Sequence, residues 1–311
     1  MALILADVGG TNVRFACARG GVIDGTLTRR FPNDDYASFD AVLDAYLAHA
    51  QVKTVEALTI AVAGPGDGAR ARLTNRDWHF DTAALTAAHS AKRVDLFNDL
   101  SALGYALDSL NADGLRTILA PDVPAPHQMQ RLVVGIGTGF NVSPVLTHEG
   151  GVTCLLAEAG LGSLPSRLRR PLEAYLGRSA DWVRCVEDVI SGPGLSRLHA
   201  EATGAPAITA RDVIERASVG DAQAQASRDV FARMLGEWIQ DLRLLYMPTG
   251  GIFLAGSVVR ALLESPAHDI FTSAVTQQPT VKSELPPVAI SVITQDEAAL
   301  LGCLAYAKAR A

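Results

Sequence analysis

Short apolar runs separated by glycine and polar clusters make up the start of the chain. Residues 2–6 and 13–18 are two such runs, and the glycine-rich segment 9–12 lies between them. Apolar runs of this length that end in turn residues are typical of buried β-strands. The pattern therefore predicts a β-hairpin with only polar and glycine residues at its tip, followed by a third strand over residues 22–31.

Helical and strand patterns then alternate as far as residue 110. Apolar residues at three- and four-residue spacing predict a helix over residues 38–50, and residues 55–63 and 93–97 read as strands. Residues 101–110 form a second helical pattern, which Ser101 is placed to cap. Strands joined by crossover helices predict a mixed α/β unit.

The second half repeats the opening pattern on a larger scale. After a proline-rich loop at 121–126, strands at 132–136 and 141–146 flank a second glycine and threonine turn. Helical patterns follow at residues 166–176, 195–202, 211–217, 222–246 and 296–310. Two further strands are predicted at residues 252–255 and 288–294. Two similar hairpins predict two related domains. We expect a small α/β domain from residues 1–110 plus the C-terminal helix 296–311, and a large α/β domain from residues 111–295.

Composition excludes several classes of protein. The 311 residues are 49% hydrophobic and 19% charged, which is enough to bury large cores and argues against disorder. The formal net charge is −6, and the densest basic cluster, residues 167–170, is too short to follow a nucleic acid. We expect that cluster to be an exposed helix face, with a phosphate site as the weaker alternative, and we expect no nucleic-acid partner.

Cysteine spacing and the N-terminus indicate the compartment. The four cysteines, Cys17, Cys154, Cys185 and Cys303, lie in apolar surroundings without CxxC spacing, so buried thiols in a reducing compartment are expected. No charged leader precedes the first apolar run, which is too short for a signal peptide or a membrane span. The sequence therefore predicts a cytoplasmic protein without a membrane partner, and it leaves a homodimer open.

Candidate chemistry lies at the predicted strand ends. The glycines of the turn Gly9-Gly10-Thr11-Asn12 free the backbone where a Cβ would clash and present N–H groups to an anion. Asp7, just before the turn, could hold a metal ion or its water. A plain surface hairpin explains this segment equally well on its own. The P-loop, the dinucleotide-binding GxGxxG, HExxH and GxSxG motifs do not occur.

A second carboxylate follows another strand. Asn98 and Asp99 come directly after residues 93–97, at the carboxyl end where open α/β sheets bind their ligands. An aspartate there can accept a proton from a hydroxyl that the neighbouring asparagine orients. An aspartate in a helix-start loop is an equally good interpretation of these two residues alone.

Six segments along the chain decide between these interpretations. They are Asp7-Val8-Gly9-Gly10-Thr11-Asn12; Ala63-Gly64-Pro65 with Thr74-Asn75-Arg76-Asp77-Trp78; Phe97-Asn98-Asp99; Gly137-Thr138-Gly139; Glu187-Asp188-Val189-Ile190-Ser191-Gly192-Pro193-Gly194-Leu195; and Gly250-Gly251-Ile252-Phe253-Leu254-Ala255-Gly256. In this order they resemble the bacterial glucokinase family, of the actin-like hexokinase superfamily, nearly end to end.

The resemblance implies a fold, an activity and a set of site residues. It implies an α/β protein of two actin-like (ribonuclease-H-like) domains with an interdomain cleft. It also implies ATP-dependent, Mg²⁺-assisted phosphorylation of the 6-hydroxyl of glucose or a related hexose, with Asp99 as general base and Asp7 near the metal ion, through water. Sugar hydroxyls would be held by Asn75, Asn98, Glu158 and Glu187. The nucleotide would be held by Asp7, Gly9, Gly10, Thr11, Asn12, Gly137, Thr138, Gly139, Gly251 and Gly256.

The chain departs from the family pattern in one region. The family carries Glu-Gly-Gly-His where this chain has Glu158-Ala159-Gly160-Leu161, and residues 163–165 also differ. Leucine forms no side-chain hydrogen bond, and a buried hydroxyl left unpaired costs roughly 1–3 kcal/mol. Asn141 also stands where the second phosphate turn usually has glycine. The preferred sugar and the turnover are therefore open.

Two rival functions remain. One is a kinase for another hexose or an amino sugar, with the changed loop at Leu161 setting the different sugar preference. A non-catalytic sugar-binding regulator on the same fold is the other rival, and the presence of both Asp7 and Asp99 argues against it, because a pure binder does not need both.

Overall fold

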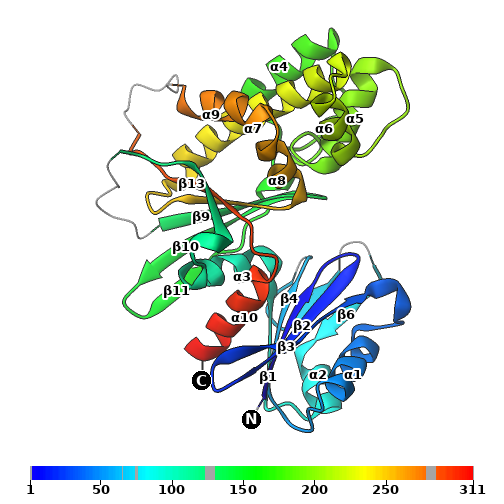
Figure 1. The fold of residues 1–311 in the computed structure, drawn as a ribbon, viewed down its shortest axis with the longest axis vertical. Coiled ribbons are helices and arrows are strands. Elements are labelled where there is room, and N and C mark those ends of the chain that lie inside the picture. The colour runs from blue at the N-terminus through cyan, green and yellow to red at the C-terminus, as the bar shows by residue number, and fades with distance from the viewer. Residues whose placement is uncertain (1, 65, 74–75, 123–129, 278–284, 311) are drawn as a thin grey trace. The chain divides into compact units, whose positions relative to one another are not determined.

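The chain folds into two compact units, each with its own sheet and core (Figure 1). The computed structural model describes residues 2–64, 66–73, 76–122, 130–277 and 285–310. The first unit comprises Met1–Gly114, His148–Leu156 and Gln295–Ala311, and the second comprises Leu115–Thr147 and Ala157–Thr294. The protein is of the α/β class, as predicted.

A mixed five-stranded sheet forms the centre of the first unit. Its strands, in the order β3-β2-β1-β4-β7, are β3 (Val22–Pro32), β2 (Asn12–Arg19), β1 (Ala2–Val8), β4 (Val55–Val62) and β7 (Arg93–Asn98). The first three pair antiparallel, whereas β1, β4 and β7 run parallel to one another. The carboxyl ends of β1 and β7 therefore lie at the same edge of the sheet.

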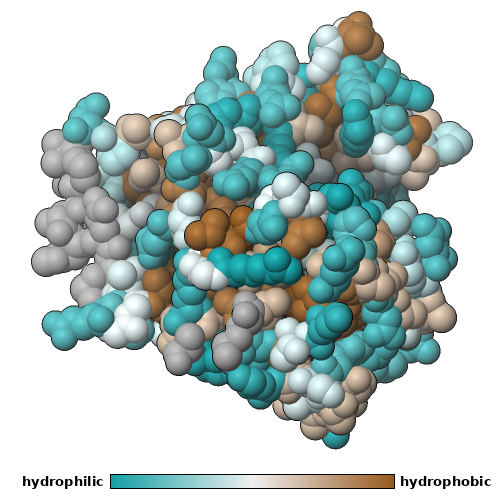
Figure 2. All heavy atoms as spheres, turned by 60° about the horizontal axis from the view of Figure 1, so that its bottom comes forward, coloured by the Kyte–Doolittle hydropathy of each residue, from teal (hydrophilic) through white to brown (hydrophobic). Residues whose placement is uncertain are grey.

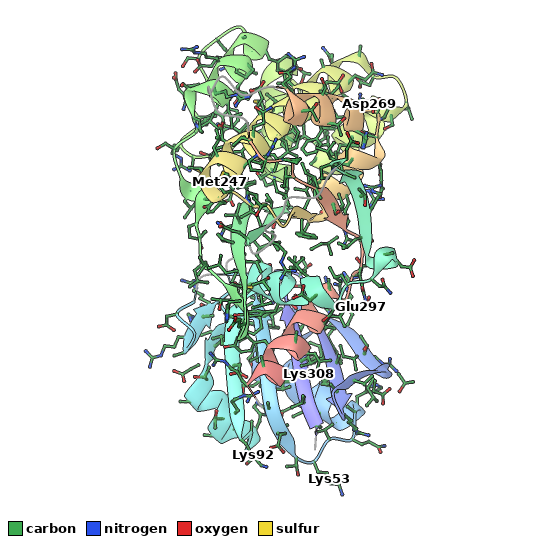
Figure 3. All side chains as sticks on the ribbon, turned by 90° about the vertical axis from the view of Figure 1, so that its left-hand side faces the viewer. Lys53, Lys92, Met247, Asp269, Glu297 and Lys308 are labelled. Atoms are coloured by element: carbon green, nitrogen blue, oxygen red, sulfur yellow. The ribbon has the colours of Figure 1, made fainter. Side chains whose placement is uncertain are left out.

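Helices cover both faces of this sheet because successive residues of β1 point to opposite sides. Ile4 packs into the core with α1 (Phe39–His49) and α2 (Thr82–His89), and Leu5 packs with α3 (Asp99–Ala106) and α10 (Ala298–Ala309). Glu297 precedes α10 and Lys308 lies in its last turn, where a positive charge suits the helix dipole (Figure 3).

The helices α3 and α10 approach closely at Gly302. A Cβ on Gly302 would lie 1.7 Å from the carbonyl oxygen of Ala102, so only glycine fits. The first unit also contains β5 (Arg70–Arg72), β6 (His79–Asp81) and β11 (Gly151–Cys154), with the 3-10 helices η1 (Asn33–Asp35), η2 (Leu107–Ser109) and η3 (Ala112–Gly114).

The second unit also has a mixed sheet, with strands in the order β10-β9-β12-β13-β8. These are β10 (Phe140–His148), β9 (Gln130–Ile136), β12 (Ile252–Ala255), β13 (Ile290–Ile293) and β8 (Leu115–Leu119). The strands β9, β12 and β13 are parallel, and the pairs β9–β10 and β13–β8 are antiparallel. The centre of this sheet thus consists of parallel strands, as in the first unit.

The helices of the second unit share one large apolar core with its sheet. They are α4 (Ser166–Leu176), α5 (Gly192–Thr203), α6 (Ala210–Ser218), α7 (Ala222–Tyr246), α8 (Ser257–Glu264) and α9 (Ala267–Thr276), with the 3-10 helix η4 (Ala159–Leu161). At Gly236 of α7, a Cβ would lie 2.8 Å from the backbone oxygen of Phe271, which brings α7 and α9 into close contact.

Three sequence expectations need correction. Ser101 is buried inside α3, and the side chain of Asn98 caps that helix instead. Arg167 and Arg169 are half-buried and bind Asp241 and Glu173, so the basic cluster is not simply an exposed face. The four cysteines are thiols outside any disulfide, but Cys154 and Cys185 are only half-buried. Of the expected loop at 121–126, residues 123–126 lie outside the described residues.

Hydrophilic and apolar residues are interspersed over the face seen in Figure 2. Within the described ranges, no helix has the length and apolar character needed to cross a bilayer.

Candidate active site

Two aspartates lie at the carboxyl edge of the first unit's sheet. Asp7 is level with Ala61 of the central strand β4, and Ala61 is level with Phe97 of β7. Asp99 follows Phe97 by two residues and begins α3. The parallel strands therefore bring together two carboxyl groups that are 92 positions apart in the sequence.

Local hydrogen bonds fix the start of α3. Asn98 Oδ1 accepts from the backbone N–H of Leu100 at 2.9 Å, and Asn98 Nδ2 donates to the carbonyl of Gly64 at 3.4 Å. Asp99 Oδ1 also accepts from the Leu100 N–H at 2.9 Å. This arrangement holds both side chains at the strand end and explains why asparagine, a good N-cap, stands there.

Burial raises the pKa of both aspartates, and the charge of Asp7 adds to the rise at Asp99. Desolvation raises the pKa of Asp99 to about 7, and the negative charge of Asp7 contributes to that rise. Desolvation raises the pKa of Asp7 to about 6, against the opposing effect of Arg14, whose guanidinium lies 3.7 Å away. Asp99 can therefore exchange a proton near neutral pH, which suits a general base.

The first glycine turn lies directly beside Asp7. Gly9 N–H donates to the carbonyl of Asn12 at 3.0 Å, and the side chain of Asn12 donates to Thr11 Oγ1 at 2.8 Å. A Cβ on Gly9 would have ordinary contacts, 3.5 Å from the Asn12 oxygen, so the expected clash does not explain this glycine. What glycine provides here is open backbone that a ligand can approach.

Sequence reasoning missed Asn33, the first residue of η1, which anchors this turn. Asn33 is fully buried, its Nδ2 donates to the carbonyl of Gly9 at 2.9 Å, and its backbone N–H donates to the carbonyl of Thr11 at 2.9 Å. The only sequence signal was an asparagine after Pro32, which reads as a turn residue.

The second glycine turn connects β9 and β10 in the other unit. Gly137 N–H donates to the carbonyl of Gly139 at 3.0 Å, and Gly192, at the start of α5, donates to the carbonyl of Gly137 at 2.8 Å. Gly256 has a φ of +111°, and a Cβ there would lie 2.2 Å from the Ile136 oxygen. Gly251, at a φ of +118°, precedes β12. Gly137, Gly192 and Gly256 thus converge on one backbone region, which sequence alone did not show for Gly192. Gly251 lies at the other end of β12, where its carbonyl accepts from the N–H of Leu132 near the start of β9, so it is not part of this region.

Two glutamates lie beside this second turn. Glu187 Oε2 accepts from the backbone N–H of Phe140 at 2.8 Å. Burial raises the pKa of Glu158, and the negative charge of Glu187 raises it further. Their electrostatic coupling places the two predicted sugar ligands of this unit in one acidic group.

The loop that carries the family departures is tied to the same group. Asn141 Nδ2 donates to Glu158 Oε2 at 3.0 Å, and Leu161 ends the short helix η4. Asn141 lies within β10, opposite Gly135, rather than in the turn itself. Leu161 is 65% exposed and does not fill a space inside the protein.

Comparisons with known proteins identify the family. The family model described as Glucokinase matches residues 4–310. A glucokinase from Chromobacterium violaceum is 31% identical over 97% of this chain and 88% of its own length. The chain belongs to the glucokinase family. This confirms the resemblance that the six sequence segments indicated.

Solved structures share the fold of this glucokinase-family chain. A glucokinase from an Antarctic psychrotroph superposes with a TM-score of 0.78 at 27% identity, covering 98% of both chains. A ROK family glucokinase from Streptomyces griseus, solved with glucose and AMPPNP, superposes with a TM-score of 0.64 at 21% identity and covers 98% of both chains.

Some predicted site residues are not brought together by a single unit. The first unit contains Asp7, Gly9, Gly10, Thr11, Asn12, Asn98 and Asp99. The second unit contains Gly137, Thr138, Gly139, Glu158, Glu187, Gly251 and Gly256. Asn75 lies outside the described residues. Each unit therefore supplies one glycine turn and at least two carboxylates.

The acidic side chains fit a magnesium ion held mainly by a ligand's own phosphates. Among the residues that the structure describes, no group of three or more His, Cys, Asp or Glu side chains could enclose a metal. Mg²⁺ is usually bound through one or two carboxylates, water and substrate phosphates rather than by an all-protein cage. Asp7, with an oxygen donor beside the first glycine turn, fits that kind of site.

Proposed function

We propose that this chain is an ATP-dependent kinase that phosphorylates the 6-hydroxyl of glucose. Membership of the glucokinase family supports the reaction, and the glucose and AMPPNP bound to the Streptomyces griseus relative support the two substrates. The two compact units would be the actin-like (ribonuclease-H-like) domains that the resemblance implies. The predicted bounds, residues 1–110 with 296–311 and 111–295, differ from those of the units mainly at residues 148–156, which belong to the first unit.

Asp99 would act as the general base. It accepts the proton of the sugar 6-hydroxyl, the hydroxyl oxygen forms a bond to the γ-phosphorus of ATP, and the bond from that phosphorus to the β–γ bridging oxygen breaks to release ADP. A pKa of about 7 lets Asp99 take up the proton at neutral pH and return it afterwards. The capping bonds of Asn98 would hold the base in position.

Binding residues would come from both units. The sugar hydroxyls would be held by Asn75, Asn98, Glu158 and Glu187, because carboxylate and amide groups can form hydrogen bonds with hydroxyls. The turns Gly9–Asn12 and Gly137–Gly139 would bind phosphate through backbone N–H groups and threonine hydroxyls, with Gly256 beside the adenosine. Gly251, at the opposite end of β12, would not contact the nucleotide directly. Gly137 supports this, since a Cβ there would meet no atom within 4 Å and a phosphate can come close.

Asp7 would hold Mg²⁺ through water. The ion would neutralise phosphate charge, which this chain needs because it has no P-loop lysine. Arg14 is paired with Asp7 across the hairpin. Its positive charge lowers the pKa of Asp7 and so opposes the rise that burial causes.

The observation that carries the proposal is the raised pKa of Asp99 at the strand end beside Asp7. A coupled assay of ADP release across a panel of hexoses tests it. We expect glucose-dependent ADP release in wild type that is lost in Asp99→Asn. Equal ADP release with and without every hexose would contradict the proposal.

A second candidate is a kinase for another hexose or an amino sugar. The exposed Leu161, next to the Glu158 region, favours it, because an apolar side chain at the site suits a substituent less polar than a hydroxyl. The same panel decides between them through the ratio of kcat/KM values. A cytoplasmic location, consistent with four thiols outside any disulfide, and a homodimer remain predictions.

A further inference from the structure

Every hydrogen-bonding position of the Asn141 side-chain amide is used. Its Nδ2 donates to the carbonyl of Ala157 at 2.7 Å and to Glu158 Oε2 at 3.0 Å. Its Oδ1 accepts from the backbone N–H of Val142 at 2.8 Å and of Ala159 at 3.1 Å. A primary amide has two N–H donors and two acceptor lone pairs, so no capacity is left over.

These four contacts determine which way the amide faces. Turning it over would point the NH₂ group at two backbone N–H donors and the oxygen at a carbonyl and a carboxylate. The bond to Glu158 is assisted by the negative charge of the carboxylate, which makes it stronger than a neutral hydrogen bond. Asn141 also lies on a strand, where the antiparallel pairing with Gly135 fixes its backbone. The amide is therefore a rigid support.

Backbone contacts hold the far end of the same loop. Glu187 N–H donates to the carbonyl of Gly160, and Val186 N–H donates to the carbonyl of Gly162, both at 2.9 Å. A Cβ on Gly160 would lie 2.0 Å from the Phe140 oxygen, so this part of the loop packs directly on β10. Within the described contacts, Asn141 supplies the side-chain bond to the Glu158 carboxylate, and the backbone supplies the rest.

We propose that Asn141 is the positioning residue of the sugar site, holding the Glu158 carboxylate against the repulsion of Glu187. This deepens the proposed function and rests on it. Without the amide, Glu158 is free to turn away from Glu187 toward solvent, and the pair loses the spacing that two sugar hydroxyls require. Asn141 acts through Glu158 and does not itself contact the reacting atoms, so sugar binding should suffer far more than the chemical step.

Two substitutions separate this role from simple packing. Asn141→Asp keeps the shape of the side chain but places a carboxylate against the Ala157 carbonyl and Glu158. Asn141→Gly removes the amide without adding a charge. We expect KM for the sugar to rise about tenfold in Asn141→Gly and about a hundredfold in Asn141→Asp, with KM for ATP unchanged and kcat within about threefold. A packing role predicts the reverse order, because Asp fills the same space.

A control and a partner variant complete the test. Asn111 also accepts from two backbone N–H groups, those of Asp113 and Gly114, but it belongs to the first unit, whereas Glu158 belongs to the second, so Asn111→Asp should leave sugar KM unchanged. In a Glu158→Gln background, the effect of Asn141→Asp should shrink, since the new amide can donate to the new carboxylate. An undiminished effect would contradict coupling through Glu158.

Hydrogen exchange of residues 157–162 gives a readout that does not need activity. The Ala159 amide should exchange faster in Asn141→Gly, which loses the oxygen that accepts from it, than in wild type and in Asn111→Asp. Unchanged exchange, or a sugar KM within twofold of wild type in both variants, would overturn the inference while leaving a glucose-dependent kinase intact. If wild type phosphorylates no hexose, the proposed function fails, and exchange together with calorimetric sugar binding still decides the role of Asn141.

Discussion

The negative charge of Asp7 raises the pKa of Asp99. Both carboxyl groups are desolvated, and β1 and β7 bring them to the same sheet edge on either side of β4. Burial is the larger cause of the raised pKa of Asp99 and the like charge of Asp7 adds to it, so Asp99 holds its proton up to a pH of about 7. The sheet thus supplies both a carboxylate for a metal ion and a base that titrates near neutral pH.

Replacing the base should reduce turnover and spare binding. General base catalysis is typically worth about 10²–10⁴-fold, so Asp99→Asn should lower kcat by that order. The asparagine Oδ1 can still accept from Leu100 N–H, so the helix start and sugar affinity should change little. Steady-state kinetics with calorimetric sugar binding checks this. A variant that retains most of its kcat would remove Asp99 from the mechanism.

The same substitution should stabilise the ligand-free protein at alkaline pH. The pKa of Asp99 is raised from 3.8 to about 7, so the stability it contributes is complete below pH 4 and is lost as the pH rises through 7. That difference corresponds to at most about 4 kcal/mol. Asp99→Asn carries no charge at this position, so it does not lose this stability as the pH rises. Its Tm should therefore exceed that of wild type at pH 8, and the gap should narrow toward pH 5.

The pH dependence of this gap provides the control. A general improvement in packing would raise the Tm of Asp99→Asn equally at both pH values. Equal gains at pH 5 and pH 8, or a lower Tm at pH 8, would show that burial of the Asp99 charge does not weaken the fold.

Removing Mg²⁺ should abolish phosphoryl transfer, and removing the Asp7 carboxylate should weaken Mg²⁺ binding. Backbone N–H groups and threonine hydroxyls cannot offset the phosphate charge alone, so ATP use should stop in excess EDTA and return with added Mg²⁺. Asp7→Ala should raise the Mg²⁺ concentration needed for half-maximal rate. If Asp7 only shapes the turn, this variant loses stability but keeps its rate per folded molecule and its Mg²⁺ dependence.

Adding a methyl group at Gly256 should disrupt the second glycine turn. At Gly256→Ala the Cβ would lie 2.2 Å from the Ile136 oxygen, in addition to the strain of a positive φ. Gly204 shares a positive φ, +69°, but a Cβ there meets nothing within 4 Å. Gly256→Ala should therefore cost several times the roughly 1 kcal/mol expected for Gly204→Ala in denaturant unfolding, and it should weaken ATP binding. Equal costs for the two would contradict the close approach.

Regular elements were predictable where the apolar pattern was strong. The first hairpin, the helix after Ser38 and the long α7 fall where the sequence placed them, because β-branched runs and three- and four-residue spacing dominate there. The strands β5, β6, β8 and β11 and the helices α2 and α9 were missed, since they are short or carry mixed patterns. Asn98, and not Ser101, caps α3, because the helix starts two residues earlier than its apolar pattern.

Site residues were predictable where a motif marks them, and supporting residues were not. Asp7, Asp99 and the glycine turns stand in recognisable segments. Asn33 and Asn141 act through bonds to residues 24 positions and 16 to 18 positions away, and no local pattern announces such contacts. Asn141 was noticed only as a departure from glycine, whereas the structure shows it binding the Glu158 loop.

Leu161 yields the most consequential prediction. It stands where the family pattern has histidine, it is exposed, and it cannot form a side-chain hydrogen bond with a sugar. His199 cannot replace it, because its Nδ1 contacts Ser227 in a buried position. His148 contacts Thr153 at the end of β10. The missing hydrogen bond should weaken glucose binding by roughly 1–3 kcal/mol relative to a histidine-containing relative, and KM for glucose should be correspondingly higher. The chemistry at Asp99 should be retained.

Restoring the histidine tests whether leucine is a loss or a specificity element. Since η4 is held by backbone bonds and Leu161 is exposed, Leu161→His should fold normally and improve kcat/KM for glucose about tenfold or more. Leu161→Ala is the control, because it removes the isobutyl group without adding a donor, and it should leave glucose use low. If Leu161→His instead worsens glucose use while wild type turns over another sugar efficiently, the leucine selects that sugar and glucose is not the natural substrate.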